Sequence, residues 1–261
     1  MTSVQVKQLF TYPVKGLTPQ VENYVDLQAG HGIPGDRVFA LMYEGSSNQA
    51  SPVVPWMKKQ NFAMQCHLPE LAALACHYDS TTKTLTVKRQ GAELVVADTD
   101  TPSGRDRLGA FFTGYITATQ RSGRSLRFVG DRNGKTRYPD REAVHLSLLS
   151  VATINELSEV AENAVDVRRF RPNIVLDSVP AWAEFDWVGG RFQLGQAQID
   201  IVAPINRCLN IDVNPDTGEQ DIPLLSLLKK HFGHRQTGVL AKVITNGRVN
   251  VGDRLIFAHN S

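Results

Sequence analysis

The chain has 261 residues, 42% of them hydrophobic, which is enough to bury the core of one large domain or of two ordinary ones. Its 28 Lys and Arg residues nearly balance its 26 Asp and Glu residues, so the overall charge gives no reason to expect a nucleic-acid or anionic-membrane partner. We therefore expect neither partner, and any basic site must be local.

Short runs with strand chemistry recur through the first half of the chain, each bounded by Gly, Pro, Asp or Ser. They predict strands at 5–12, 37–43, 71–78, 84–89, 93–97 and 126–129. Such spacing favours a closed or sandwiched antiparallel sheet. A helix is predicted at 105–113, where Leu108, Phe111 and Phe112 share one face, and it could plug one end of that sheet.

Residues 122–139 are rich in Gly, Ser and Arg and predict a domain boundary. Ser150 is expected to cap a helix that runs to about Ala161, because Ile154, Leu157 and Ala161 form an apolar stripe. This is the clearest helix in the sequence.

The remaining elements are strands at 174–177, 192–194 and 197–202 and a helix at 223–231, which Gly233 is expected to end. The last part reads as a β-hairpin. Its strands are predicted at 239–245 and 248–257, and Asn246-Gly247 supplies the positive φ angles of a tight two-residue turn.

The three cysteines, Cys66, Cys76 and Cys208, form no CxxC motif and no zinc-like spacing with histidine. Their odd number argues against a disulfide framework and favours a reducing compartment. The first sixteen residues alternate polar and apolar side chains, unlike a signal peptide or a membrane anchor. Together these features predict a soluble, cytoplasmic protein.

Cys208 follows an arginine in the segment 203–210 (APINRCLN), where a proline interrupts a strand-like run. A neighbouring cation lowers the pKa of a thiol, and the thiolate is the form that attacks electrophiles or binds soft metals. Cysteine is also among the most buried residue types, so an inert core thiol fits the same local pattern.

Three further segments place cations beside strands: 12–17 (YPVKGL), 35–41 (GDRVFAL) and 168–174 (RRFRPNI). Arginine forks match phosphate oxygens, and Asn173 can both donate and accept hydrogen bonds. Taken singly, the segments fit a turn, a structural ion pair and a solvated strand entrance equally well. The segment 214–219 (NPDTGE) reads as a capped turn that shapes the Cys208 loop.

Considered together, these segments resemble the MOSC proteins that carry an N-terminal MOSC-associated β-barrel, a group that includes the mitochondrial amidoxime-reducing component and related bacterial proteins. The resemblance rests on YPVKGL, GDRVFAL, HLSLLSVATINEL, RRFRPNIVLD, INRCLNIDVNPDTGEQ and VGDRLIF, in that order over nearly the whole chain. It implies a mainly β fold with a few helices. An N-terminal β-barrel of residues 1–125 would precede a MOSC β-barrel domain of residues 126–261.

The resemblance also implies a molybdenum cofactor in the cleft between the two domains, with Cys208 on the metal. A soft thiolate suits a metal that two dithiolene sulfurs of the pterin already hold. The positions that match the family's cofactor contacts are Lys15, Arg37, Ser147, Arg169, Arg171, Asn173 and Arg207. Cys208 and Asp212 are the candidate catalytic residues, and protons would come from Asp212 or from solvent.

The sequence departs from the family pattern at several positions. Gly16 stands where a serine is common, and Ile205 replaces the first cysteine of a CSRC motif. Ile211 and Asp212 replace paired threonines on the expected substrate side. Residues 56–69 match poorly, so we carry no site residue over from them.

The resemblance implies an oxidoreductase that reduces N-hydroxylated or N-oxygenated small molecules. Its electrons would come from a separate partner, a ferredoxin-like protein or a flavin reductase, because the chain lacks the cysteine cluster of an iron–sulfur module. The alternative is a carrier or maturation module for the cofactor, or for sulfur as a Cys208 persulfide. Nothing here resembles the pyridoxal-phosphate desulfurase half of cofactor sulfurases. A scaffold that has lost its cofactor is the third possibility.

Overall fold

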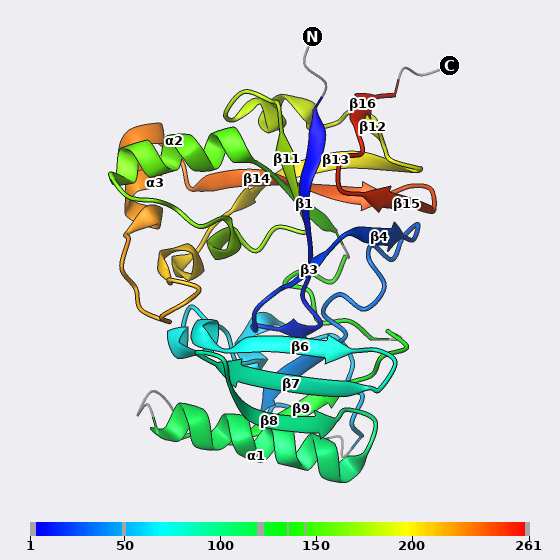
Figure 1. Ribbon diagram of the computed structural model, residues 1–261, viewed down its shortest axis with the longest axis vertical. Coiled ribbons are helices and arrows are strands. Elements are labelled where there is room, and N and C mark those ends of the chain that lie inside the picture. The colour runs from blue at the N-terminus through cyan, green and yellow to red at the C-terminus, as the bar shows by residue number, and fades with distance from the viewer. Residues whose placement is uncertain (1–3, 49–50, 119–122, 135, 144, 259–261) are drawn as a thin grey trace.

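The computed structural model describes residues 4–48, 51–118, 123–134, 136–143 and 145–258. The fold is mainly β, as expected, and its elements form two lobes stacked along the long axis of the molecule (Figure 1). The larger lobe holds the N-terminal strand together with most of the second half of the chain. The smaller lobe holds the strands and the long helix of the first half.

An eight-stranded sheet in the order β16-β12-β13-β14-β10-β11-β1-β3 forms the larger lobe. Its strands are β1 (Gln5–Thr11), β3 (Gln20–Glu22), β10 (Leu146–Ser150), β11 (Ile174–Asp177), β12 (Arg191–Leu194), β13 (Ala197–Asn206), β14 (Gln236–Val243) and β16 (Leu255–Phe257). Its neighbouring strands are antiparallel except β10 and β11. A parallel pair needs a crossover connection, and helix α2 (Val151–Ala161) lies in that connection.

The helices of the larger lobe confirm the predicted caps. Ser150 accepts a hydrogen bond from the backbone N–H of Thr153 at 3.1 Å, so α2 begins where the sequence indicated. Helix α3 (Leu224–Phe232) ends at Gly233, whose φ of 73° is left-handed. Leu157 of α2 and Leu228 of α3 pack in one buried cluster.

The smaller lobe contains two three-stranded sheets and helix α1 (Pro102–Ala118). One sheet joins β2 (Val14–Lys15), β5 (Phe39–Tyr43) and β9 (Leu126–Gly130), and the other joins β6 (Ala75–Asp79), β7 (Thr84–Arg89) and β8 (Ala92–Asp98). Phe39 lies against both Tyr78 and Phe128, with ring centroids 5.1 Å apart in each pair. Leu108 and Phe112 of α1 complete this core.

Two boundaries in the smaller lobe differ from the prediction. The helix expected at 105–113 extends over the whole of α1. The strand expected at 71–78 starts only at Ala75, because Pro69–Ala73 form a 3-10 helix with the proline in its first turn. Proline suits that position because it has no backbone N–H to leave unpaired.

The predicted C-terminal hairpin is wrong. Strand β14 is already paired on both edges, with β13 and β10, so the following strand β15 (Gly247–Asn250) pairs instead with β4 (Tyr24–Leu27). Gly247 does not have the positive φ of a two-residue turn. Glycine is required there because an added Cβ would lie 2.4 Å from the carbonyl carbon of Gln196.

The domain division expected between residues 125 and 126 stays a prediction. Strand pairing joins segments from both sides of that point: β1 pairs with β11, and β9 pairs with β5. Because β1 and β11 are antiparallel, the segment after β1 lies next to the segment before β11.

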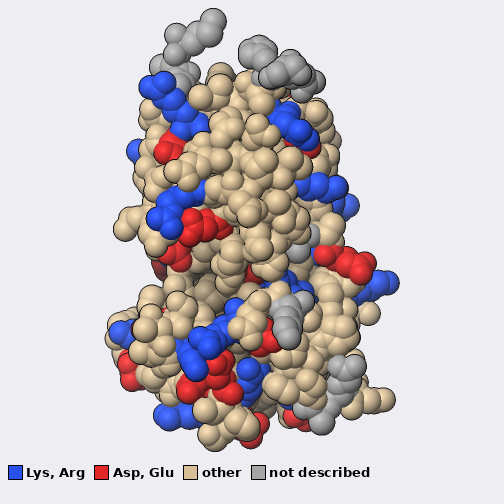
Figure 2. Space-filling view, turned by 90° about the vertical axis from the view of Figure 1, so that its right-hand side faces the viewer, with Lys and Arg blue, Asp and Glu red and all other residues tan. Residues whose placement is uncertain are grey.

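The surface of the protein carries mixed charge. On the face seen in Figure 2, Lys and Arg side chains lie interspersed with Asp and Glu side chains. Among the described residues, no helix combines the length and the apolar character needed to cross a lipid bilayer.

Replacing Gly247 with alanine should lower the free energy of unfolding by about 1–3 kcal/mol, because the new methyl group overlaps the Gln196 backbone. Gly114 is the matched control, since it is exposed in α1 with open space around it. Gly114→Ala should raise the free energy of unfolding by about 0.5–1 kcal/mol. Urea denaturation followed by circular dichroism measures both. Wild-type stability for Gly247→Ala contradicts the close approach.

Candidate functional site

A cavity of about 330 Å³ is lined by residues of both lobes. It brings together eight of the nine residues expected at the site: Lys15, Arg37, Ser147, Arg169, Arg171, Asn173, Arg207 and Cys208. Lys59 and Arg141 also line it, and Asp140 is the one carboxylate among its described lining residues. The cavity therefore has a large surplus of positive charge.

The buried carboxylate of Asp36 organises one wall of this cavity. One of its oxygens accepts hydrogen bonds from the Tyr12 backbone N–H at 2.8 Å and from the Asn173 side chain at 3.3 Å. The other oxygen pairs with Arg37 and, at 3.2 Å, with Arg137. One carboxylate thus holds together the end of β1, the turn before β5 and the start of β11.

Arg37 and Arg171 are held in place by the ring of Tyr12. Their guanidinium carbons lie 4.9 and 4.3 Å from its centroid. Both arginines have left-handed backbone, with φ of 55° and 52°, which costs free energy for a residue with a side chain. Burial raises the pKa of Tyr12 well above its ordinary value, so the ring stays neutral between the two cations.

Lys15 is enclosed at the bottom of the cavity, where its side chain is only 2% exposed. Its ammonium group pairs with Asp140, whose side chain is 63% exposed and belongs to the loop between β9 and β10. Burial lowers the pKa of Lys15, and the Asp140 carboxylate opposes that shift. Burial acts to raise the pKa of Asp140, but nearby cations, Lys15 foremost, hold it below its ordinary value.

Ser147 and Asn173 line the cavity but use their polar atoms on each other. The Ser147 hydroxyl donates to the Asn173 side-chain oxygen at 3.1 Å and accepts from the Asn173 backbone N–H at 3.0 Å. The Asn173 amide nitrogen donates to Asp36 and to the Phe10 carbonyl. Their contribution is to fix the wall between β10 and β11.

Arg169 is buried and only partly satisfied. Its Nη atoms donate to the Asp212 carbonyl at 3.1 Å and to Asp221 at 2.9 Å, while its buried Nε has no hydrogen-bond partner. An unpaired buried donor is costly. The carboxylate of Asp212 does not line the cavity. It accepts from the Leu225 backbone N–H at 2.9 Å, at the start of α3.

Cys208 lies at the end of β13, where the chain leaves the sheet, and it is exposed. Arg207 anchors this turn by donating to the Phe170 carbonyl at 2.8 Å and to the Thr237 carbonyl at 2.9 Å. Burial lowers the pKa of Arg207 to about 10, which still leaves it charged at neutral pH. The neighbouring Cys66 thiol holds the pKa of Cys208 below its ordinary value.

Part of this arrangement resembles a known family. Residues 130–256 match the MOSC domain. The matched segment contains seven of the nine expected site residues, from Ser147 to Asp212, while Lys15 and Arg37 lie outside it.

The chain is also distantly related to mitochondrial amidoxime-reducing components. It is 33% identical to component 2 of Bos taurus over 91 residues, which are 35% of this chain and 26% of that protein. It is 33% identical to component 1 of Mus musculus over 101 residues, which are 39% of this chain and 28% of that protein. The match spans little more than a quarter of either relative.

Two solved structures are similar at low sequence identity. The YuaD protein of Bacillus subtilis aligns with 99% of this chain and 97% of its own, with a TM-score of 0.46 and 12% identity. YiiM of Escherichia coli aligns with 44% of this chain and 55% of its own, with a TM-score of 0.34 and 21% identity.

The sequence pattern missed Cys66, which belongs to the poorly matching segment 56–69. Its thiol lies close enough to Cys208 for the two groups to shift each other's pKa. Beside this pair, Asn210 donates to the side chain of Gln65 at 3.3 Å, so the same two segments meet twice. Lys59 and Met64 of this segment line the cavity as well. No signal in the sequence connects residues 56–69 with the Cys208 loop.

Gly16 departs from the family pattern for a steric reason. It has a φ of 80°, and an added Cβ would lie 2.4 Å from the Ala63 carbonyl oxygen. No other residue fits this position without moving the backbone of the smaller lobe. The close approach of Ala63 thus excludes a serine side chain from this side of the cavity.

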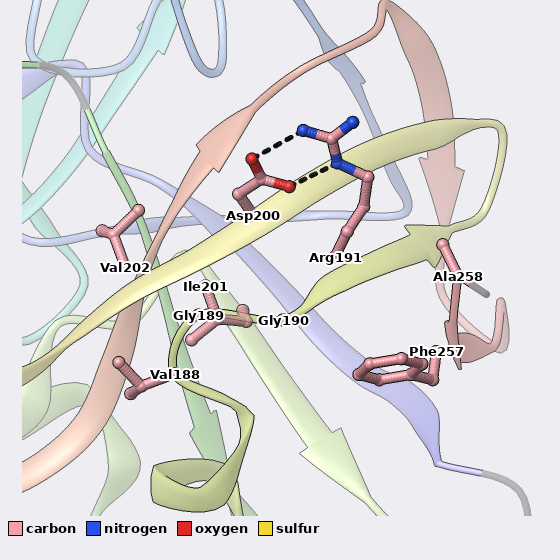
Figure 3. Close-up of a pocket in the computed structure, with 9 residues that line it drawn as sticks. All are labelled: Val188, Gly189, Gly190, Arg191, Asp200, Ile201, Val202, Phe257 and Ala258. Carbon is pink, nitrogen blue, oxygen red and sulfur yellow. Dashed lines mark hydrogen bonds and ion pairs between the residues drawn. The ribbon is translucent and has the colours of Figure 1, made fainter. Parts of the chain in front are cut away.

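A second hollow, of about 570 Å³, lies between β12, β13 and the end of the chain (Figure 3). Its only charged lining groups are Arg191 and Asp200, which bind each other at 2.6 and 2.8 Å. Glycines and apolar side chains form the rest of its described lining. With its charges already paired, this hollow offers no group for catalysis.

Replacing Asp140 with asparagine should tighten the binding of pyrophosphate about tenfold, because the carboxylate competes with an external anion for Lys15. Isothermal titration calorimetry at fixed ionic strength measures the affinity. Asp200→Asn removes an equal charge from the second hollow and should leave the affinity unchanged. Weaker binding to Asp140→Asn contradicts the competition.

The alkylation rate of Cys208 in the reduced protein should rise with pH through an inflection below the ordinary thiol value of about 8.5, because the thiolate is the nucleophile. In Cys66→Ala the inflection should move up toward that ordinary value, since the neighbouring thiol that stabilises the thiolate is lost. Iodoacetamide labelling followed by peptide mass spectrometry gives the rates. Cys76→Ala is the control, and an unmoved inflection in Cys66→Ala rejects the role of Cys66.

Proposed function

We propose that this protein is a molybdenum-cofactor-dependent oxidoreductase that reduces N-hydroxylated or N-oxygenated small molecules. The observation that carries the proposal is the accessible Cys208 thiol beside a cavity whose described lining holds seven cations and one carboxylate. The MOSC domain and the distant relationship to amidoxime-reducing components support it. The proposed place of action is the cytoplasm.

The residues present fit such a cofactor. A phosphate needs charged donors in fixed positions when it leaves water, and Lys15, Arg37 and Arg171 are charged donors held by buried contacts. The thiolate character of Cys208 suits a soft metal.

In this proposal Lys15, Arg37 and Arg171 hold the phosphate and the polar edge of the pterin, and Cys208 is the protein ligand of molybdenum. When bound, the cofactor supplies the oxidation–reduction chemistry that removes oxygen from the substrate. Arg207 keeps the Cys208 turn in place through its bonds to the Phe170 and Thr237 carbonyls.

The proton source in this proposal is solvent at the open mouth of the cavity. Asp212, the other candidate, has its carboxylate engaged at the start of α3. Burial raises its pKa above the ordinary value, but the group has no place in the cavity lining. Solvent reaches Cys208, which is exposed.

The electrons come from a separate partner protein, either ferredoxin-like or a flavin reductase. The 261 residues contain three cysteines, and Cys76 is buried in β6. A ferredoxin-type cluster needs four thiolates, so this chain does not hold one.

Purification from a host that makes molybdopterin tests the proposal. We expect molybdenum and pterin at about one per chain, together with reduction of benzamidoxime by an artificial electron donor. Bound cofactor without reduction would support the alternative, a cofactor carrier. Absence of both molybdenum and pterin, in a host that loads a known molybdoenzyme, rejects both functions.

Cys208→Ala should lower benzamidoxime reduction at least 100-fold while the fold remains intact, because an exposed thiol contributes little core volume. Cys76→Ala is the matched control. It removes a buried thiol that does not line the cavity, so it should cost roughly 1 kcal/mol of stability and leave the rate per bound molybdenum unchanged. Full activity of Cys208→Ala defeats the assigned ligand role.

A further inference from the structure

Two thiols from different lobes meet at the mouth of the cavity. Cys66 lies between the 3-10 helices Lys59–Asn61 and Pro69–Ala73, and Cys208 begins the 3-10 helix Leu209–Asp212. The two thiols lie close enough for each to shift the pKa of the other, at a junction where Asn210 donates to the Gln65 side chain at 3.3 Å. Neither the proposed cofactor contacts nor the proposed proton path uses Cys66.

The surroundings of the pair hold the two thiols near each other while leaving them accessible. Gln65 and Asn210, both buried, hydrogen-bond across the same junction at 3.3 Å. Cys208 is exposed and Cys66 is partly exposed, so small reagents reach them. Both thiols lie in segments outside regular strands. The backbone there can move enough to bring the two sulfur atoms to bonding distance.

We propose that Cys66 and Cys208 form a reversible disulfide that joins the two lobes. While the site holds no cofactor, this bond makes the Cys208 thiol unavailable as a metal ligand. The disulfide itself rests on the contact between the two thiols and is independent of the proposed function. Its consequence, that oxidised protein does not load the cofactor, rests on Cys208 being the metal ligand.

The oxidant is a hydroperoxide such as hydrogen peroxide. Cys208 sulfur attacks one peroxide oxygen, the O–O bond breaks, and one water leaves as Cys208 becomes a sulfenic acid. Cys66 sulfur then attacks Cys208 sulfur, the S–O bond breaks, and a second water leaves as the disulfide forms. Two thiols lose two electrons and two protons, and hydrogen peroxide is reduced to two waters. A dithiol reductant reverses the change.

Cys76 serves as an internal reference. It is 9% exposed in β6, and its thiol donates to the Leu74 carbonyl at 3.6 Å. Among the described residues, the groups that act on its thiol are Thr18 and Arg171, and neither of the other cysteines is one of them. A reaction that depends on proximity therefore spares Cys76, whereas random oxidation does not distinguish the three.

The test uses full-length protein without cofactor, reduced, freed of reductant and treated with equimolar hydrogen peroxide. Free thiols are then alkylated in denaturant and counted by intact mass. We expect three labels before oxidation and one after, with Cys66 and Cys208 joined in the peptide map and three labels restored by dithiothreitol. The cross-link should raise the melting temperature by about 10 °C, since it closes a long loop.

Two cysteine variants test which thiols form the disulfide. Cys76→Ala should still lose two labels, and Cys66→Ala should form no intramolecular disulfide. Three labels retained after oxidation of the wild type, or a cross-link that includes Cys76, overturns the inference.

Protein loaded with cofactor separates this inference from the proposed function. Its Cys208 sulfur is on the metal, so the same treatment should leave three labels and the molybdenum in place. If loaded protein forms the disulfide yet keeps its molybdenum, the ligand role of Cys208 fails while the inference stands. If the empty protein forms no disulfide, the inference fails and the ligand role is untouched.

Discussion

The buried Asp36 carboxylate is the interaction on which the cavity depends. It is 2% exposed and bonds to the Tyr12 backbone N–H, Arg37, Arg137 and Asn173. Each of these groups belongs to a different part of the chain, and three of them carry or border the residues that line the cavity. Loss of one member of such a buried ionic group leaves an unpaired charge, which costs about 3–5 kcal/mol. The contacts that stabilise the fold therefore also shape the cavity.

The local pattern of the sequence was sufficient where the signal is local. Helix α2 begins after Ser150 and helix α3 ends at Gly233, as expected, because caps depend on a few neighbouring residues. The turn predicted at Asn246-Gly247 is wrong for the opposite reason. Its conformation depends on which strands occupy the edges of β14 and on the backbone of Gln196, and both are set by residues far away in the sequence.

The same distinction applies to the cavity. Lys15, Arg37, Arg171 and Cys208 carry motifs beside strand ends, and the structure brings them together. Cys66 lies in a segment of short 3-10 helices without periodicity, and its contact with Cys208 is decided by how the lobes pack. A sequence alone also does not say whether a polar group is free. The Asn173 amide and the Asp212 carboxylate are occupied by neighbours that only the fold supplies.

The position of β1 in the large sheet has a consequence for biosynthesis. This strand leaves the ribosome well before its partner β11, which is made more than 160 residues later, and β14, which joins β10 to β13, is made later still. At ordinary translation speeds the nascent chain waits on the order of ten seconds with that edge unpaired. An unpaired strand edge is a template for aggregation, so heat-shock chaperones that bind extended segments should matter more for producing this protein than its moderate size suggests.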